Sequence, residues 1–182
     1  LGIVAQLNEN NRATARIQHF AQWSGTSPDF GELPSNFNAF VDVFFAKKSS
    51  DDSLAGEAQN ALGNHLGSYF FEYNFGTSIG NFALYHEHLF EDGSGTRFAN
   101  FPDGVWGVNL ELEREGVLSH ILYEYVDTSD QSGNSSSSGF DGYFGNNIYR
   151  SGWSYEDRVI GVPFILVDPS IELDMDSSRY VS

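Results

Sequence analysis

The chain has 182 residues, a formal net charge of −16 at pH 7 and a sequence pI of about 4.4. Its nine lysines and arginines do not cluster, which argues against nucleic acid and anionic lipid head groups as partners, because phosphate binding needs grouped basic side chains. There is no cysteine, so neither a disulfide framework nor a thiolate metal site can form. No apolar run approaches the eighteen or more residues of a transmembrane helix, whereas the strands of a membrane barrel need only about 9–11 residues of alternating polarity.

Alternating apolar and polar residues predict a series of antiparallel strands. In chain order, the predicted segments are residues 1–7, 12–23, 37–45, 69–75, 81–90, 106–113, 117–125 and 159–166. The longest of them run ten to twelve residues, compared with about five or six in soluble proteins. One face is rich in aromatic and aliphatic side chains and the other carries Arg, Gln, Asn and Glu, which suits lipid on one side and a wet lumen on the other. We therefore expect an all-β fold, an antiparallel transmembrane β-barrel of the outer-membrane type, with a soluble all-β domain as the alternative.

The links between the predicted strands differ in length on the two sides of the expected sheet. If strand direction alternates, the long links on one side are residues 48–64, 91–103 and 128–156. Residues 76–78 and 115–116 form tight turns on the other side, and this asymmetry is typical of outer-membrane barrels, whose long loops lie outside the cell. Two links do not fit, because residues 24–36 are long and residues 8–11 are short for their sides. No linker separates two domains, so we expect one partial barrel over residues 1–182.

The sharpest local motif is His86-Glu87-His88. Residues i and i+2 of a strand share a face, so both imidazoles could reach one metal ion. Together with Gly80, the motif partly resembles the first motif of cupins, but the glycine expected after the next acid is displaced and His120 is the only later histidine. A soluble cupin-like or jelly-roll metalloenzyme that uses the two histidines is therefore kept as an alternative. We favour a histidine pair in the lumen or in the aromatic girdle, and expect no metal and no cofactor.

Acidic side chains could also carry chemistry. Glu111 and Glu113 share a strand face, and Glu124 on the next strand could point the same way. Glycoside hydrolysis needs two carboxyl groups roughly 5–9.5 Å apart, which neighbours on one face could provide. Acids that line a barrel interior are expected without catalysis, so we predict no catalytic residue and no enzymatic activity.

The longest predicted link combines flexibility with aromatic residues. Residues 131–139 are rich in glycine and serine and should be solvated. Four aromatic residues that follow are Tyr143, Phe144, Tyr149 and Trp153. Aromatic faces pack on pyranose rings, so these four are the predicted polysaccharide-binding residues. The alternative is that they fold the link back onto the barrel or belong to its interfacial girdle.

Six ordered blocks of the sequence carry a family resemblance. They are Gly63-Asn-His-Leu-Gly67-Ser, Tyr85-His-Glu-His-Leu-Phe-Glu-Asp-Gly-Ser-Gly95, Asp103-Gly-Val-Trp-Gly107, Leu122-Tyr-Glu-Tyr-Val-Asp-Thr-Ser-Asp-Gln-Ser-Gly133, Asn147-Ile-Tyr-Arg-Ser-Gly-Trp-Ser-Tyr155 and Val159-Ile-Gly161. In order and spacing, they resemble the capsule assembly Wzi family over roughly residues 11–163. Several blocks that agree in order are more specific than any single motif.

The resemblance implies a large outer-membrane barrel of a Gram-negative bacterium that acts as a lectin rather than an enzyme. Its implied partners are surface or capsular polysaccharide, outer-membrane lipid and other outer-membrane proteins. An accessory structural subunit of a larger outer-membrane complex is a further alternative. The family barrel has more strands than the eight or so expected here, and residues 177–182 do not form an aromatic-ended final strand. We therefore expect a chain that is truncated at both ends.

Overall fold

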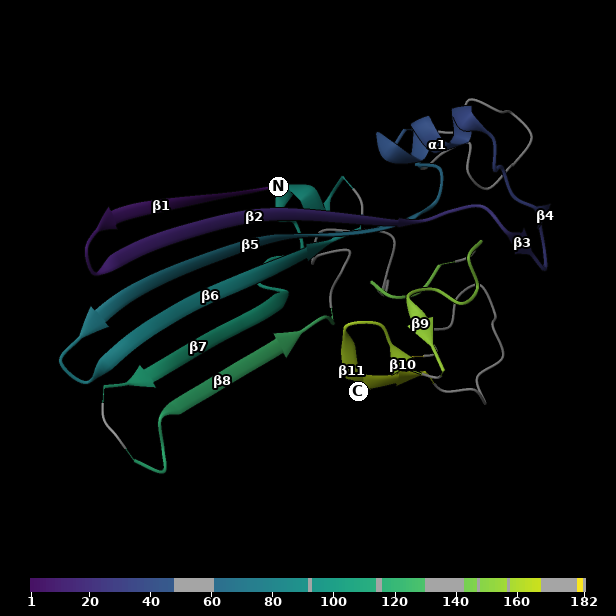
Figure 1. Ribbon diagram of the computed structural model, residues 1–182. Helices are drawn as coiled ribbons and strands as arrows, with labels where there is room; N and C mark the ends of the chain where they lie inside the picture. Colours follow the sequence, from purple (N-terminus) through teal and green to yellow (C-terminus); the bar gives the residue numbers. More distant parts are fainter. Residues whose placement is uncertain are drawn as a thin grey trace. The chain divides into compact units, whose positions relative to one another are not determined.

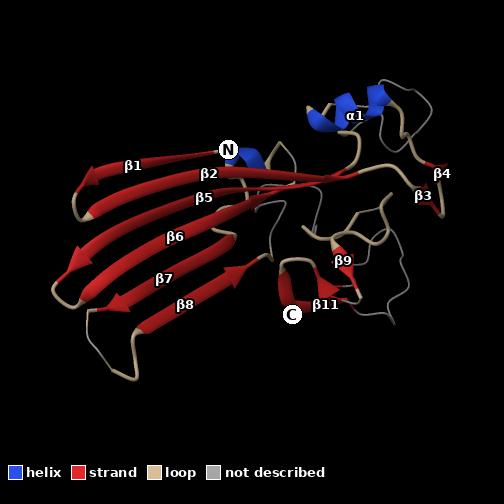
Figure 2. Cartoon of the chain, viewed as in Figure 1, coloured by secondary structure: helices blue, strands red, loops and turns tan. Residues whose placement is uncertain are grey.

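The computed structural model describes most of the chain. The described residues are 1–47, 61–91, 93–113, 116–129, 143–146, 148–156, 158–167 and 180–181. The chain divides into two compact units. The first comprises Leu1–His19 and Gly67–Gly139, and the second comprises Phe20–Leu66 and Phe140–Ser182. Strands account for most of the described secondary structure (Figure 2).

A six-stranded antiparallel sheet is the largest element of the fold (Figure 1). In spatial order, its strands are β1 (Gly2–Asn8), β2 (Asn11–Gln22), β5 (Asn64–Thr77), β6 (Gly80–Phe90), β7 (Gly104–Leu112) and β8 (His120–Asp127). Spatial order follows chain order, so the sheet is a meander. Among the described residues it is not closed into a barrel, because β1 and β8 are its two edges. The predicted antiparallel β architecture is thus confirmed, and the described strands form an open sheet.

Six of the eight predicted strand segments coincide with these six strands. The pairing register places the alternating apolar residues side by side: Leu84 on β6 lies opposite Tyr73 on β5 and Val108 on β7. At the far edge, Ile3 on β1 lies opposite Ala15 on β2. Because side chains alternate between faces along a strand, this register gathers the apolar positions of all six strands on one face.

Residues 37–45 were predicted as a strand, and this prediction is wrong. They form helix α1 (Phe37–Phe44), whose N-terminus is capped by the Asn36 side chain accepting a hydrogen bond from the Ala39 N–H at 2.9 Å. The apolar residues of this segment satisfy helical spacing as well as alternation. Ala39 and Val43, four residues apart, are buried against Leu62, and this packing decides for the helix. Among the described residues, no helix is long and apolar enough to cross a membrane.

The segment predicted as a strand over residues 159–166 is a hairpin. The strands β10 (Arg158–Val159) and β11 (Val162–Val167) pair around Gly161, whose φ of +86° lies in the left-handed region that glycine adopts readily. These strands belong to a small four-stranded sheet in the order β12-β11-β10-β9. The remaining short elements are β3 (Thr26–Ser27), β4 (Gly31–Glu32), the 3-10 helix η1 (Gly95–Arg97), β9 (Ser154–Tyr155) and β12 (Tyr180–Val181).

Removing residues 37–45 from the strand count also regroups the links. The connections β1–β2, β5–β6 and β7–β8 have two, two and seven residues, and all three lie at the same end of the strands. The links across residues 23–63 and 91–103 leave from the opposite end of the strands, as does the chain after Asp127. With one strand fewer, every strand after β2 runs in the direction opposite to the one expected. The two links that did not fit the asymmetry, residues 8–11 and 24–36, therefore lie on the sides that suit their lengths.

Candidate functional site

One face of the six-stranded sheet is apolar and exposed. We call this surface the apolar face; it consists of Ile3, Ala5, Ala13, Ala15, Ile17, Phe71, Tyr73, Leu84, Trp106, Val108, Ile121, Tyr123 and Tyr125. Side chains from both edges and from the centre are open: Ile3 is 71 % exposed, Leu84 42 % and Tyr123 65 %. Part of the face forms a shallow, almost wholly apolar hollow of about 660 Å³. A contiguous apolar surface of this kind marks contact with a partner or with a membrane.

The opposite face carries charged and polar side chains that contact one another across strands. Arg12 on β2 lies 3.9 Å from the Glu72 carboxylate on β5, and Asn74 donates a hydrogen bond of 2.6 Å to the same carboxylate. The guanidinium of Arg16 lies 4.5 Å from the centre of the Phe70 ring, within cation–π range. We call this surface the polar face. Its contacts cross-link β2 to β5.

The same network continues toward the other edge of the sheet. Ser68 donates a hydrogen bond of 2.6 Å to Glu87, and the Tyr85 hydroxyl donates to Glu124 across the intervening strand β7. The Tyr85 ring can cross β7 because Gly107 lies beneath it, and a Cβ at that position would overlap the ring. Sequence reasoning missed this arrangement, although a glycine in the middle of a strand is the signal for close approach of a neighbour.

Two of the three acidic residues considered for catalysis, Glu111 and Glu124, lie on the polar face. Glu111 is opposite His120 on β8, and their side chains approach to 3.9 Å. Glu124 is opposite Gly107, four residues from Glu111 along the chain direction of β7. At about 3.4 Å per residue, this separation is roughly 14 Å, longer than the spacing used in glycoside hydrolysis. Glu113 lies beyond the end of β7 and is exposed.

His86 and His88 lie on one face of β6, and each ring donates a hydrogen bond to a backbone carbonyl. His86 Nδ1 donates to the Val105 oxygen at 3.2 Å, and His88 Nε2 donates to the Gly95 oxygen at 2.9 Å. A carbonyl can only accept, so these nitrogens carry the protons. The remaining ring nitrogens, His86 Nε2 and His88 Nδ1, are buried and have no hydrogen-bond partner in the described structure. Each ring also stacks, His86 on Trp106 at 3.8 Å between centroids.

These contacts anchor the link 91–103 to the sheet. His88 stacks on Phe98 at 4.3 Å, Asn100 donates to the Leu89 carbonyl at 2.9 Å, and Trp106 donates to the Pro102 carbonyl at 2.9 Å. A metal site would need further ligands near the two imidazoles. Within the described residues, no group of three or more histidines, cysteines or acids could hold a metal ion. His88 holds this link to β6 through Gly95 and Phe98, whereas His86 bonds to Val105 on the neighbouring strand β7 and contacts the link through the Phe101 ring.

The aromatic residues predicted to bind polysaccharide lie in the second unit. Tyr143, Phe144 and Tyr149 are buried, and Trp153 is half-buried, with its backbone N–H donating to the Phe144 carbonyl at 2.9 Å. Three of the four aromatic rings are thus packed inside the second unit. Sugar binding by these four residues stays a prediction. The glycine- and serine-rich residues 131–139 lie outside the described part of the chain.

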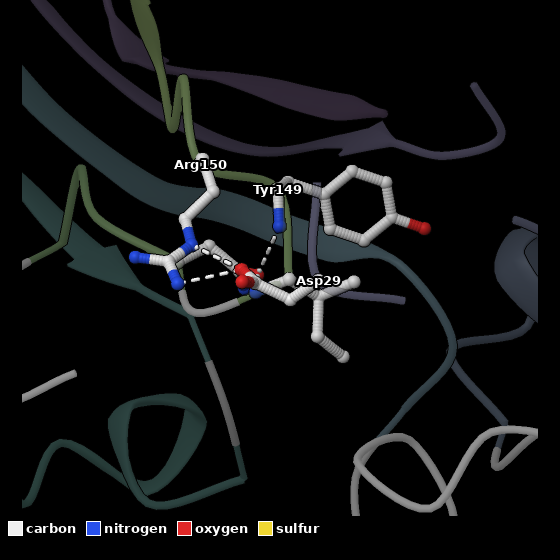
Figure 3. A network of polar contacts seen from close by, with 5 residues as sticks. Asp29, Tyr149 and Arg150 are labelled. Atoms are coloured by element: carbon white, nitrogen blue, oxygen red, sulfur yellow. Dashed lines mark hydrogen bonds and ion pairs between the residues drawn. The ribbon is translucent and has the colours of Figure 1, made fainter. Parts of the chain in front are cut away.

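A polar contact fixes this segment to the rest of its unit. Arg150 donates from Nε and Nη2 to one carboxylate oxygen of Asp29, at 2.8 and 2.6 Å (Figure 3). Asp29 lies in the turn between β3 and β4, so the contact joins positions 121 residues apart in the sequence. Nearby, Gln22 on β2 donates to the Ser151 hydroxyl at 3.2 Å. These polar side chains therefore make hydrogen bonds within the second unit.

Comparison with known proteins finds no matching family model, no matching curated protein and no matching solved structure. The function must therefore be inferred from the geometry of the chain itself. Its most informative feature is the contrast between the two faces of the sheet. Charged and polar side chains contact one another on the polar face, which also exposes Val4 and Leu122, and a broad set of apolar side chains stands open on the apolar face.

Proposed function

We propose that the six-stranded sheet is part of the wall of an outer-membrane β-barrel, with its apolar face toward lipid and its polar face toward the lumen. The observation that carries the proposal is the exposed apolar face opposite a cross-linked polar face. A soluble sheet would bury its apolar face against a second layer. In a barrel wall, the lipid solvates that face, and polar side chains line the interior.

Strand length and connection length support the same conclusion. A membrane strand needs about 9–11 residues, and β2, β5 and β6 have 12, 14 and 11. The shorter connections at one end of the strands and the long links at the other end match the periplasmic turns and extracellular loops of outer-membrane barrels. The long links would then face the outside of a Gram-negative cell.

The two edges of the sheet support a larger barrel. Among the described residues, β1 and β8 pair with a strand on one side only, and closed bacterial barrels have at least eight strands. Unpaired backbone groups within a bilayer are costly, so we infer that further strands complete the wall. The same open edges favour the second candidate role, an accessory subunit that joins other outer-membrane proteins.

For the complete protein, we propose a non-enzymatic role in binding or organising surface polysaccharide, as in the capsule assembly Wzi family. The support is the ordered set of sequence blocks that resembles this family, together with the long links at one edge of the sheet. Binding of the full chain to purified capsular polysaccharide, measured by biolayer interferometry in detergent, tests this role. Binding no stronger than to an unrelated neutral glucan would refute it and leave the accessory role.

The orientation of the wall can be tested separately with tryptophan fluorescence. Trp106 lies on the apolar face, and the other two tryptophans are Trp23 and Trp153. The W23F/W153F double variant of the full chain, reconstituted in phosphatidylcholine vesicles, leaves Trp106 as the only reporter. We expect brominated acyl chains to quench its fluorescence strongly. Fluorescence that is the same in brominated and ordinary lipid would refute the proposed orientation.

A further inference from the structure

Helix α1 presents a row of phenylalanines to solvent. We call this row the phenylalanine strip; it consists of Phe37, Phe40, Phe44 and Phe45. The four side chains are between 45 % and 77 % exposed. Their rings follow one another along the helix, with centroid distances of 6.3, 6.1 and 5.1 Å. The strip is therefore one continuous apolar surface.

The strip is not the side of the helix that packs on the protein. At 100° per residue, the three helical members of the strip, Phe37, Phe40 and Phe44, span about 60° of the helix circumference, and Ala39 and Val43 lie outside this arc. These two residues are the buried ones, and they pack against Leu62. Asn38 and Asp42 are the only polar residues of the helix. An amphipathic helix of a soluble protein turns polar side chains outward, whereas α1 confines its two polar residues to a narrow edge and turns phenylalanines outward.

The exposed area of the strip is too small for a stable protein partner. With about 200 Å² for a whole phenylalanine side chain, the exposed fractions correspond to roughly 500 Å². A standard protein–protein interface buries about 800 Å² on each partner and requires a complementary groove. A bilayer interface accepts a single convex helix without shape complementarity.

The chemistry at the end of the strip also fits lipid. The ammonium group of Lys47 lies 5.2 Å from the centre of the Phe45 ring, at the C-terminal end of the strip. A lysine beside aromatic rings can keep its charge at the level of the lipid phosphates while the rings enter the acyl region. The rest of the strip carries no charge.

We propose that the phenylalanine strip of α1 inserts into the interfacial region of a lipid bilayer. The strip acts as a surface anchor, with the helix lying in the plane of the interface. This anchoring site is separate from the strands of the sheet and does not depend on whether the sheet spans the membrane. Its ligand is a phospholipid surface.

Trp23 provides a native reporter for this contact. Its ring centroid lies 6.0 Å from that of Phe40. The W106F/W153F variant of the full chain, in phosphatidylcholine vesicles, leaves Trp23 as the only tryptophan. We expect lipids brominated near the head group to quench Trp23 more than lipids brominated near the chain end. Equal fluorescence in brominated and ordinary lipid would overturn the proposal and would leave a protein partner as the occupant.

Substitutions on the helix show whether the strip makes the contact. In the same background, F37S/F44S removes two phenylalanines that point away from the core, and quenching of Trp23 should fall to the level in ordinary lipid. The matched control N38S makes a serine at an exposed position outside the strip and should leave quenching unchanged. Quenching that persists in F37S/F44S, while circular dichroism shows a folded chain, would overturn the proposal.

The two single-tryptophan reporters separate this proposal from that of the barrel wall. Quenching of Trp106 without quenching of Trp23 would retain the wall and reject the anchor. Quenching of Trp23 without quenching of Trp106 would retain the anchor and reject the wall. We expect both to be quenched, with Trp23 reporting the shallower depth.

Discussion

Replacing Leu84 with arginine tests most directly whether lipid covers the apolar face. Leu84 lies in the middle of β6, between Tyr73 and Val108, and is 42 % exposed. An arginine on the lipid face of a barrel costs about 2–4 kcal/mol at the bilayer midplane. That range corresponds to about a 30- to 900-fold loss in the folding equilibrium constant. If water covers this face, the same substitution should change the free energy of unfolding by less than about 0.5 kcal/mol.

The assay is equilibrium unfolding of the full chain by guanidinium in phosphatidylcholine vesicles, followed by tryptophan fluorescence. Ala83→Arg is the matched control, because Ala83 immediately precedes Leu84 on the same strand and points to the polar face between Asn74 and Asn109. We expect Leu84→Arg to destabilise the protein by about 2–4 kcal/mol and Ala83→Arg by much less. Equal effects of the two variants, or a Leu84→Arg effect below about 0.5 kcal/mol, would refute a lipid-covered face.

Three further predictions concern contacts within the fold. Gly107→Ala should destabilise the chain by about 1–3 kcal/mol, because its methyl group would displace the Tyr85 ring, whereas Gly116→Ala, with open space around it, should change stability little in the same denaturant titration. His88→Ala should speed hydrogen exchange in the link 91–103 by removing the ring that donates to a carbonyl of that link; unchanged exchange there would contradict its anchoring role. Arg150→Ala should cost no more than about 1 kcal/mol, and less in high salt, because its ion pair is partly exposed; a larger, salt-independent loss would show that this reasoning underestimates the contact.

The strands of the sheet were predictable because their signal is local. Alternation along a strand is a property of the pleat, and a residue such as Val108 reports its face without knowledge of its neighbours. The same locality made residues 37–45 ambiguous. Their apolar positions fit both a strand and a helix, and the contact of Val43 with Leu62 that selects the helix cannot be read from spacing alone.

The candidate site was predictable only in part. Spacing placed His86 and His88 on one face, but their roles depend on carbonyl groups of Val105 and Gly95, which come from other segments. The burial of Tyr143 and its aromatic neighbours could not be foreseen either. The sequence of a link is the same whether its aromatic rings pack inside or face solvent.

By itself, the sequence determined the six strands of the large sheet, their two contrasting faces and the unequal lengths of their connections, because each follows from residue order along one segment. Tertiary structure alone decided that the described strands form an open sheet, that the Phe37–Phe44 segment is a helix with phenylalanines turned outward, and that His88 holds a link. These features arise from contacts between residues far apart in the chain, and their free energy depends on which surfaces meet.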